Sequence, residues 1–283
     1  PFRTNGADRA TGSPPESGLP DPGMGMSPGS DRLGRKGLFE VSLGDSSITD
    51  HWVFRQLDKA RAKIDKLLGE FRFAEAYDVL YHTVWDDVAD WYVESSKIEE
   101  TNTLQFVLEY VLKLAHPFAP FVTETIWQSL LSVDKSTTLL ISQQWPKKLK
   151  FSAWAAADFD KIINIVREIR KANIELGGGQ RSLQTNNKFV LEQADLVKHL
   201  AKVSAVETGQ SGLKLDSTDF ELYLSASDAE IGRFSDNRAT AEAAKAAKIK
   251  VLEARLANKS YVERAPTELV AETRAELAKL KKT

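Results

Sequence analysis

Three aspartates close together form the group in this sequence that most resembles an acid–base site. Asp86, Asp87 and Asp90 share one stretch of chain, and Asp86 and Asp90 fall on one helix face at i,i+4 spacing. Two carboxylates on one face can act as a general acid and a general base. Helix surfaces also commonly carry such pairs as solvated groups or as partners of basic side chains, and we favour this interpretation.

Metal and nucleophile chemistry have little support in the composition. The four histidines, His51, His82, His116 and His199, have no second histidine at ligand spacing, and the chain contains no cysteine. The sequence therefore predicts no metal site and excludes disulfides, thiolate ligands and a cysteine nucleophile. It also lacks a Gly-x-Ser-x-Gly turn with a Ser-His-Asp order. The absence of cysteine fits a reducing compartment, and we expect a cytoplasmic protein.

Basic side chains are more informative, because the net charge of −2 hides an uneven distribution. Residues 47–145 carry 9 Lys/Arg against 15 Asp/Glu, whereas residues 147–171 carry 7 against 3 and residues 245–264 carry 6 against 2. Separate basic stretches suit an extended polyanion such as folded RNA, although each stretch alone also fits a solvated helix face. The basic groups are Arg55, Lys59, Arg61, Lys63, Lys66 and Arg72; then Arg167, Arg170 and Lys171; then Lys245, Lys248, Lys250, Arg255, Lys259 and Arg264.

Helical periodicity dominates the elements that must position these groups. Apolar residues recur at steps of three and four in five segments between Thr49 and Leu176, and this pattern predicts an antiparallel helical bundle. Thr49 or Asp50 is expected to cap the first helix. The second helix is expected to run from Phe73 to Trp91. Pro117 is expected to end the third helix, and Gly177-Gly178-Gly179 is expected to end the fifth. Residues 137–146 are expected to form an extended connection.

The rest of the chain predicts a small α+β unit and a helical hairpin. "KFVLE" (188–192), "SAVETG" (204–209) and "DFELYLS" (219–225) are expected to be strands, with a helix in "DLVKHLAK" (195–202). From Ile231 the chain is alanine-rich and charged, with a narrow apolar stripe. "NKSYVERAP" (258–266) interrupts it, which predicts two long antiparallel helices joined by a turn, with Pro266 in the first turn of the second.

The expected architecture is therefore mainly α: a bundle, a small α+β subdomain and a C-terminal antiparallel coiled-coil hairpin. We place these at residues 47–180, 181–228 and 229–283. Residues 1–46, rich in Gly, Pro, Ser and Asp, are expected to be a disordered or foreign extension. No apolar run approaches the length of a membrane span, and no signal peptide is visible, so we expect no membrane partner.

Four stretches of the sequence carry a resemblance to a known family. "HPFAPFVTETIWQSL" (116–130) resembles the bundle hinge shared by valyl-, leucyl- and isoleucyl-tRNA synthetases, and "RFAEAYDVLYHTVWDDVADWYVESSK" (72–97) is similar to the valyl form. These enzymes are class I aminoacyl-tRNA synthetases, and the resemblance is to their C-terminal part, most closely of the valyl type. "IVREIRKANIELGGG" (165–179) resembles the connecting helix, with glycines where the family usually has a proline. "LEARLANKSYVERAPTELVAETRAEL" (252–277) resembles the terminal coiled-coil arm of valyl enzymes.

This resemblance implies an anticodon-binding bundle and a tRNA-binding arm from a valine–tRNA ligase. Such a ligase joins valine to its tRNA with ATP, and a valine-accepting tRNA is the implied partner of what we expect to be a monomer. The family's nucleotide motifs, His-x-Gly-His and Lys-Met-Ser-Lys-Ser, do not occur here. We therefore expect a fragment, or a product with an aberrant start, that binds no cofactor and performs no catalysis by itself. The expected tRNA-binding residues are Arg55, Arg61, Lys63, Arg167, Arg170, Lys171, Lys245, Lys248, Lys250, Arg255, Lys259 and Arg264.

Two alternatives stay open on the sequence alone. The chain fits a stand-alone tRNA-binding or scaffold protein, or the same region of an isoleucyl- or leucyl-type enzyme. The hinge itself is interpreted as structural, with Phe118, Phe121 and Trp127 expected to fill the core beside Pro117 and Pro120.

Overall fold

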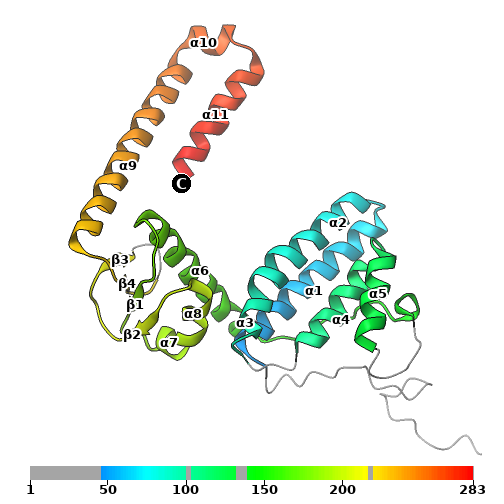
Figure 1. Ribbon diagram of the computed structural model, residues 1–283. Coiled ribbons are helices and arrows are strands. Elements are labelled where there is room, and N and C mark those ends of the chain that lie inside the picture. Colours follow the sequence, from blue (N-terminus) through cyan, green and yellow to red (C-terminus); the bar gives the residue numbers. More distant parts are fainter. Residues whose placement is uncertain (1–45, 100–102, 132–138, 216–218, 283) are drawn as a thin grey trace, which may run out of the picture. The chain divides into compact units, whose positions relative to one another are not determined.

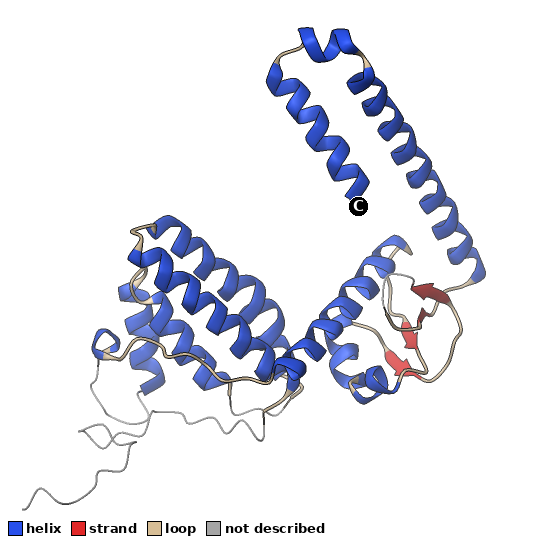
Figure 2. Ribbon diagram, turned by 180° about the vertical axis from the view of Figure 1, so that it is seen from behind, coloured by secondary structure: helices blue, strands red, loops and turns tan. Residues whose placement is uncertain are grey.

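Helices make up most of the described residues, which also contain one small sheet between residues 182 and 224 (Figure 2). The computed structural model describes residues 46–99, 103–131, 139–215 and 219–282. The mainly α class with a small α+β part is confirmed. Residues 1–45, which carry most of the expected N-terminal extension, lie outside the described residues.

The N-terminal helices pack around α1, which lies against α2, α4 and α6 (Figure 1). Their shared core includes fully buried Val53, Leu57 and Ile64 of α1, and Ile162 and Ile169 of α6. The elements are α1 Ile48–Gly69, α2 Phe73–His82, the π-helix η2 Thr83–Val93, α3 Glu94–Ser96, α4 Leu104–Ala115, α5 Pro120–Leu131, the 3-10 turn η3 Leu140–Ser142 and α6 Ala153–Glu175.

Helix α1 begins with a capping box whose cap is Ser47, two residues before Thr49 and three before Asp50, the predicted caps. The Ser47 hydroxyl accepts a hydrogen bond from the Asp50 N–H at 3.1 Å, and the Asp50 carboxylate accepts one from the Ser47 N–H at 3.0 Å. The other Asp50 oxygen accepts hydrogen bonds from the hydroxyls of Tyr92 and Thr103. A fully buried carboxylate thus ties the start of α1 to η2 and to the residue before α4.

The second predicted helix is interrupted by a π-helical segment rather than being regular throughout. Its inward-facing side chains, Ala76, Leu80, Val84 and Val88, lie four residues apart, which is more than the 3.6 residues of an α-helical turn. Side chains placed every four residues therefore move gradually around the axis of a regular α-helix and leave its buried face. The wider i→i+5 turns of η2 keep Val88 and Tyr92 directed into the core.

The hinge at residues 116–120 separates α4 from α5. Helix α4 ends at Ala115 before Pro117, as predicted, and Pro120 is the first residue of α5, where a missing N–H is tolerated. Trp127 is buried, and Phe118 packs partly buried against the core. The expectation that Phe121 fills the core is wrong, because its side chain is 87% exposed.

The position of Phe121 on α5 explains this exposure. Thr123 and Trp127 form the buried stripe of α5 at i,i+4 spacing. Phe121 precedes Thr123 by two residues, which is about 200° around a helix and thus on the opposite face. The extended connection expected at residues 137–146 is wrong at residues 140–142, which form the 3-10 turn η3, whereas Leu139 and Gln143 on either side of it are extended. Residues 137 and 138 lie outside the described ones.

The small subdomain contains a four-stranded sheet in the order β2-β1-β4-β3, with β1 parallel to β2 and the other pairs antiparallel. Its elements are β1 Ser182–Gln184, α7 Lys188–Glu192, α8 Ala194–Ala201, β2 Ala205–Glu207, β3 Leu213–Leu215 and β4 Leu222–Leu224. The predicted strands at 204–209 and 219–225 contain β2 and β4. The predicted strand at 188–192 is helix α7, because the Asn187 side chain accepts a hydrogen bond from the Val190 N–H and caps a turn there.

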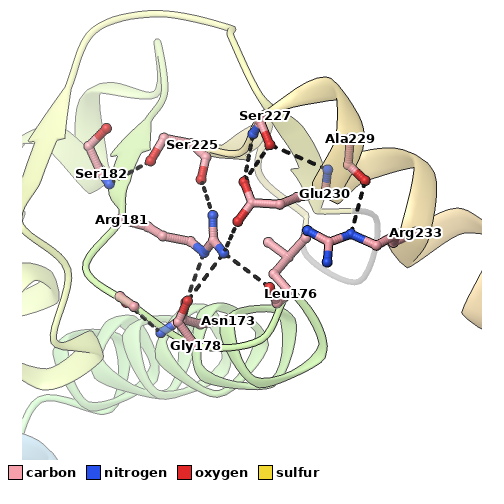
Figure 3. Close-up of polar contacts among 11 residues, drawn as sticks. Asn173, Leu176, Gly178, Arg181, Ser182, Ser225, Ser227, Ala229, Glu230 and Arg233 are labelled. Carbon is pink, nitrogen blue, oxygen red and sulfur yellow. Dashed lines mark hydrogen bonds and ion pairs between the residues drawn. The ribbon is translucent and has the colours of Figure 1, made fainter.

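One arginine joins the end of α6, the sheet and the start of helix α9, which begins at Asp228 (Figure 3). The Arg181 guanidinium donates to Asn173 Oδ1, to the carbonyls of Leu176 and Gly178 and to that of Ser225, at 3.0–3.2 Å. Its Nη2 also lies 2.9 Å from Glu230 Oε1. Between α6 and β1 the backbone passes through Gly177, Gly178 and Gly179, all with positive φ, which few other residues adopt without strain.

The C-terminal region is a helical hairpin. Helix α9 (Asp228–Ala257) is followed by the short α10 (Lys259–Arg264) and then by α11 (Thr267–Lys282), which runs antiparallel beside α9 (Figure 1). The seam contains buried Leu252, Val270 and Thr273. Two ion pairs cross it, Lys248–Glu276 at 2.6 Å and Lys281–Glu253 at 2.7 Å.

Candidate nucleic-acid interface

Two of the predicted arginines on α1 are held by carboxylates. Arg55 Nη2 lies 2.6 Å from Asp160 Oδ1, which also accepts a hydrogen bond from the Trp52 indole, so these contacts tie α1 to α6. Arg61 lies between Asp58 and Asp65 on its own helix. By contrast, the third predicted residue of this helix, Lys63, is exposed.

The predicted arginines of α6 gather over one tryptophan. The guanidinium carbons of Arg167 and Arg170 lie 5.6 and 5.4 Å from the centre of the Trp91 ring. Arg170 also donates two hydrogen bonds to the Leu200 carbonyl, at 2.7 and 3.1 Å, and so joins α6 to the end of α8. Lys171, next to it, is exposed.

The predicted residues of the hairpin lie mainly at its surface. Lys250, Arg255 and Lys259 are exposed, and Lys245 is half-buried. Lys248 differs because it forms the ion pair with Glu276 across the hairpin. The side chain of Arg264 lies outside the described residues. The structure thus divides the predicted set into side chains held by the fold and side chains open to a partner, and binding by each of them stays a prediction.

Sequence reasoning missed a cationic hollow of about 530 Å³ between the end of α3, helix α8 and the loop before β1. Three lysines and a histidine line it, together with one carboxylate: Lys97, Lys198, His199, Lys202 and Asp195, with Ile98, Gln180 and Val203. Because Lys97 is far from the others in the chain, a local charge count does not find this cluster. The available signal was the basic end of "DLVKHLAK".

The acidic stretch at residues 86–90 is divided between two environments. His82 Nδ1 lies 2.8 Å from Asp86 Oδ2, and this hydrogen bond raises the pKa of the exposed imidazole. Asp87 faces inward, where burial raises the pKa of its carboxyl and the Gln56 amide donates to it at 3.3 Å. Asp90 is exposed. In the described part of the chain, no group of three or more His, Cys, Asp or Glu side chains is arranged to hold a metal ion.

Exposed aromatic rings form a stripe along α2 and η2. Phe73, Tyr77, Tyr81 and Trp85 recur every four residues, and each is about half exposed or more. The rings of Tyr81 and Trp85 are nearly parallel, with centroids 6.5 Å apart. Acidic side chains, including Asp78 and Asp86, flank this stripe and would repel a phosphate backbone.

A second hollow, of about 380 Å³, lies beside the hinge. Pro117, Pro120 and Ile141 provide apolar walls, and Gln143 and Gln144 contribute amides. The Trp145 indole at its rim donates to Asp65 of α1. Flat apolar walls next to amide groups suit the recognition of an unpaired base.

Comparison with known proteins identifies the helical part. A family model of the anticodon-binding domain of tRNA ligases matches residues 50–184, from α1 to β1. The family match therefore covers the helical bundle and extends to β1. The chain is also similar to curated valine–tRNA ligases: 31% identical to that of Thermotoga maritima over 263 residues, 27% to that of Petrotoga mobilis over 264 and 30% to that of Chromobacterium violaceum over 265.

These matches cover 83–84% of this chain but 28–30% of the relatives. The chain thus spans under a third of the length of the valine–tRNA ligases it matches. The anticodon-binding match contains the first and second groups of predicted basic residues, up to Lys171, and also Lys97. Lys198, Lys202 and the hairpin lie beyond it. Among the described residues, no helix is both long and apolar enough to cross a membrane.

Proposed function

We propose that this chain is the tRNA-binding portion of a valine–tRNA ligase, the enzyme that joins valine to its tRNA with ATP. The match of residues 50–184 to the anticodon-binding domain of tRNA ligases carries this proposal. The names of the most similar relatives support valine, and they disfavour an isoleucyl- or leucyl-type parent. The absence of the nucleotide motifs from the sequence supports a role in binding rather than catalysis.

The two ends of the chain would perform different parts of this binding. In our proposal the bundle and α6, with Arg167 and Arg170, hold the anticodon arm, where unpaired bases offer sequence information. The hairpin, with its exposed Lys250, Arg255 and Lys259, holds the body of the tRNA through phosphates common to all tRNAs. Such contacts add affinity and salt dependence with little discrimination.

A binding titration tests the proposal directly. Fluorescence anisotropy would be measured for the purified chain with a valine-accepting tRNA transcript and with the same transcript carrying a changed anticodon. We expect tighter binding to the unchanged transcript at physiological salt. Equal affinity for the two transcripts would refute anticodon recognition. Equal affinity for the tRNA and for an unstructured RNA of the same length would refute tRNA binding as the function.

A further inference from the structure

We propose that the hollow lined by Lys97, Lys198 and Lys202 is a phosphate-binding subsite for the RNA backbone of the anticodon arm. This inference rests on the proposed function, because it names where that RNA is held. The hollow joins the helical bundle to the small subdomain: Lys97 follows α3, and Lys198 and Lys202 belong to α8 and its C-terminal cap. The residues that line it come from both sides of the end of the family match at residue 184.

The charges around the hollow favour an anion. Lys97 donates to Glu94, whose other oxygen lies 3.4 Å from His199 Nε2, so this carboxylate is already engaged. In the part of the chain that the structure describes, neither Lys198 nor Lys202 forms an ion pair. Among the described residues that line the hollow, Asp195 is the one carboxylate. Among the described residues of the lining, Lys198 and Lys202 against Asp195 leave an excess of positive charge, while Lys97 is paired with Glu94.

The backbone at Lys202 provides an independent reason for a function. Lys202 caps α8 with φ 56° and ψ 39°, a left-handed conformation that usually belongs to glycine or asparagine at this position. A lysine there costs free energy in local conformation, and such outliers cluster at binding sites. A cationic side chain at the rim of the hollow offers a reason for this cost, whereas helix capping alone would favour glycine.

The shape of the hollow favours a chain of phosphates over a small enclosed ligand. It is open, and its other described lining residues are the apolar Ile98 and Val203 and the amide Gln180. An open site with several ammonium groups can follow successive phosphodiesters of a backbone, since each ammonium acts as a point charge. The aromatic stripe of α2 and η2 is less suited to bind the RNA backbone, because the acidic side chains beside it would repel phosphates.

The test is a salt titration of tRNA binding by the double variant Lys198→Ala/Lys202→Asn. Asparagine tolerates the left-handed backbone, so the charge is removed without new strain. We expect affinity to fall about tenfold at physiological salt, and the slope of log affinity against log salt to flatten by about 1.4–1.8, as for two lost phosphate contacts. An isolated anticodon stem-loop RNA should show the same loss. Lys198→Arg/Lys202→Arg should retain binding.

The control is Lys188→Ala/Lys214→Ala, which removes two lysines of the same subdomain outside the hollow; unlike the hollow lysines, these pair with Glu192 and Glu221. Its slope should change much less than that of the hollow variant. An equal change in the control, an unchanged slope in the hollow variant, or a loss seen with whole tRNA but not with the stem-loop would each overturn the inference. All these comparisons require that the wild-type chain binds tRNA. If the wild-type chain does not bind tRNA, the proposed function is refuted, and the inference is refuted with it.

Discussion

At the scale of single residues, the contacts around a side chain decide its role more than its type does. Trp127 is 1% exposed in the core, whereas Trp85 is 60% exposed on the aromatic stripe. Arg55 is fixed by Asp160, whereas Arg255 is exposed on the hairpin. A buried tryptophan contributes to stability, whereas an exposed one is available to a partner.

Trp127→Ala should destabilise the protein by about 3–5 kcal/mol, because it leaves a large cavity under α5. Phe121→Ala is the matched control, since it removes an aromatic ring from the opposite face of the same helix. Its effect should stay within about 0.5 kcal/mol. Urea unfolding followed by circular dichroism measures both. Similar losses for the two variants would contradict the assignment of the α5 faces.

The pair of Arg181 and Glu230 predicts acid sensitivity. The hydrogen bond from Arg181 lowers the pKa of Glu230 to about 2, from an ordinary value of 4.5. A carboxyl whose pKa is depressed by folding stabilises the native state above its unfolded pKa, and this contribution is lost as the pH falls from 4.5 toward 2. Glu230→Gln should therefore be less stable than wild type at pH 7, and the difference should shrink below pH 4.5. A difference of equal size at pH 7 and pH 3 would count against this pair.

At the scale of elements, the hairpin has few buried side chains for its length. Leu252, Val270 and Thr273 are buried in its seam, and the ion pairs of Lys248 and Lys281 are exposed enough to contribute little each. Most of the α9 surface is thus open to solvent. An element with a thin seam and a basic surface is well suited to electrostatic contact with a polyanion.

Lys245→Ala/Lys250→Ala should weaken binding to valine and non-valine tRNAs to a similar degree. The reason is that the phosphates of the tRNA body are common to all tRNAs. The slope of log affinity against log salt should flatten by up to about two phosphate contacts' worth. Lys248 is kept because it pairs with Glu276, so its removal would also change the hairpin. A loss of affinity restricted to the valine tRNA would mean that the hairpin distinguishes the valine tRNA from other tRNAs.

At the scale of the whole molecule, the chain spans under a third of the length of its valine–tRNA ligase relatives. Its described residues offer surfaces for an anion and for an unpaired base. The motifs that would bind ATP in this family, His-x-Gly-His and Lys-Met-Ser-Lys-Ser, are missing from the sequence. Activity of the chain by itself is therefore a separate question from its binding of tRNA.

The purified chain should not catalyse valine-dependent exchange of pyrophosphate into ATP. The full-length valine–tRNA ligase of Thermotoga maritima serves as the positive control in the same assay. Exchange by this chain above the level without enzyme would refute the prediction. Binding of the valine tRNA without exchange is the combination that we expect.

The sequence predicted the helices well because their apolar periodicity is long, and it failed where short-range contacts decide. "KFVLE" has the composition of a strand, but the Asn187 cap makes it helical. Phe121 looked like a core residue by type, and only its phase relative to Thr123 and Trp127 places it outside. The lysines of the hollow could not be grouped in advance, because the fold alone brings Lys97 to α8.

The Arg181 junction also determines which parts of the protein open together. A single guanidinium bonds the last turn of α6, the residue after β4 and the first turn of α9. Segments that share such a tie lose protection from amide hydrogen exchange as one cooperative unit. Arg181→Lys keeps the charge but cannot reach all these acceptors at once. Exchange at the end of α6 and at the start of α9 should therefore accelerate in parallel, while amides in the middle of α1 exchange as in wild type.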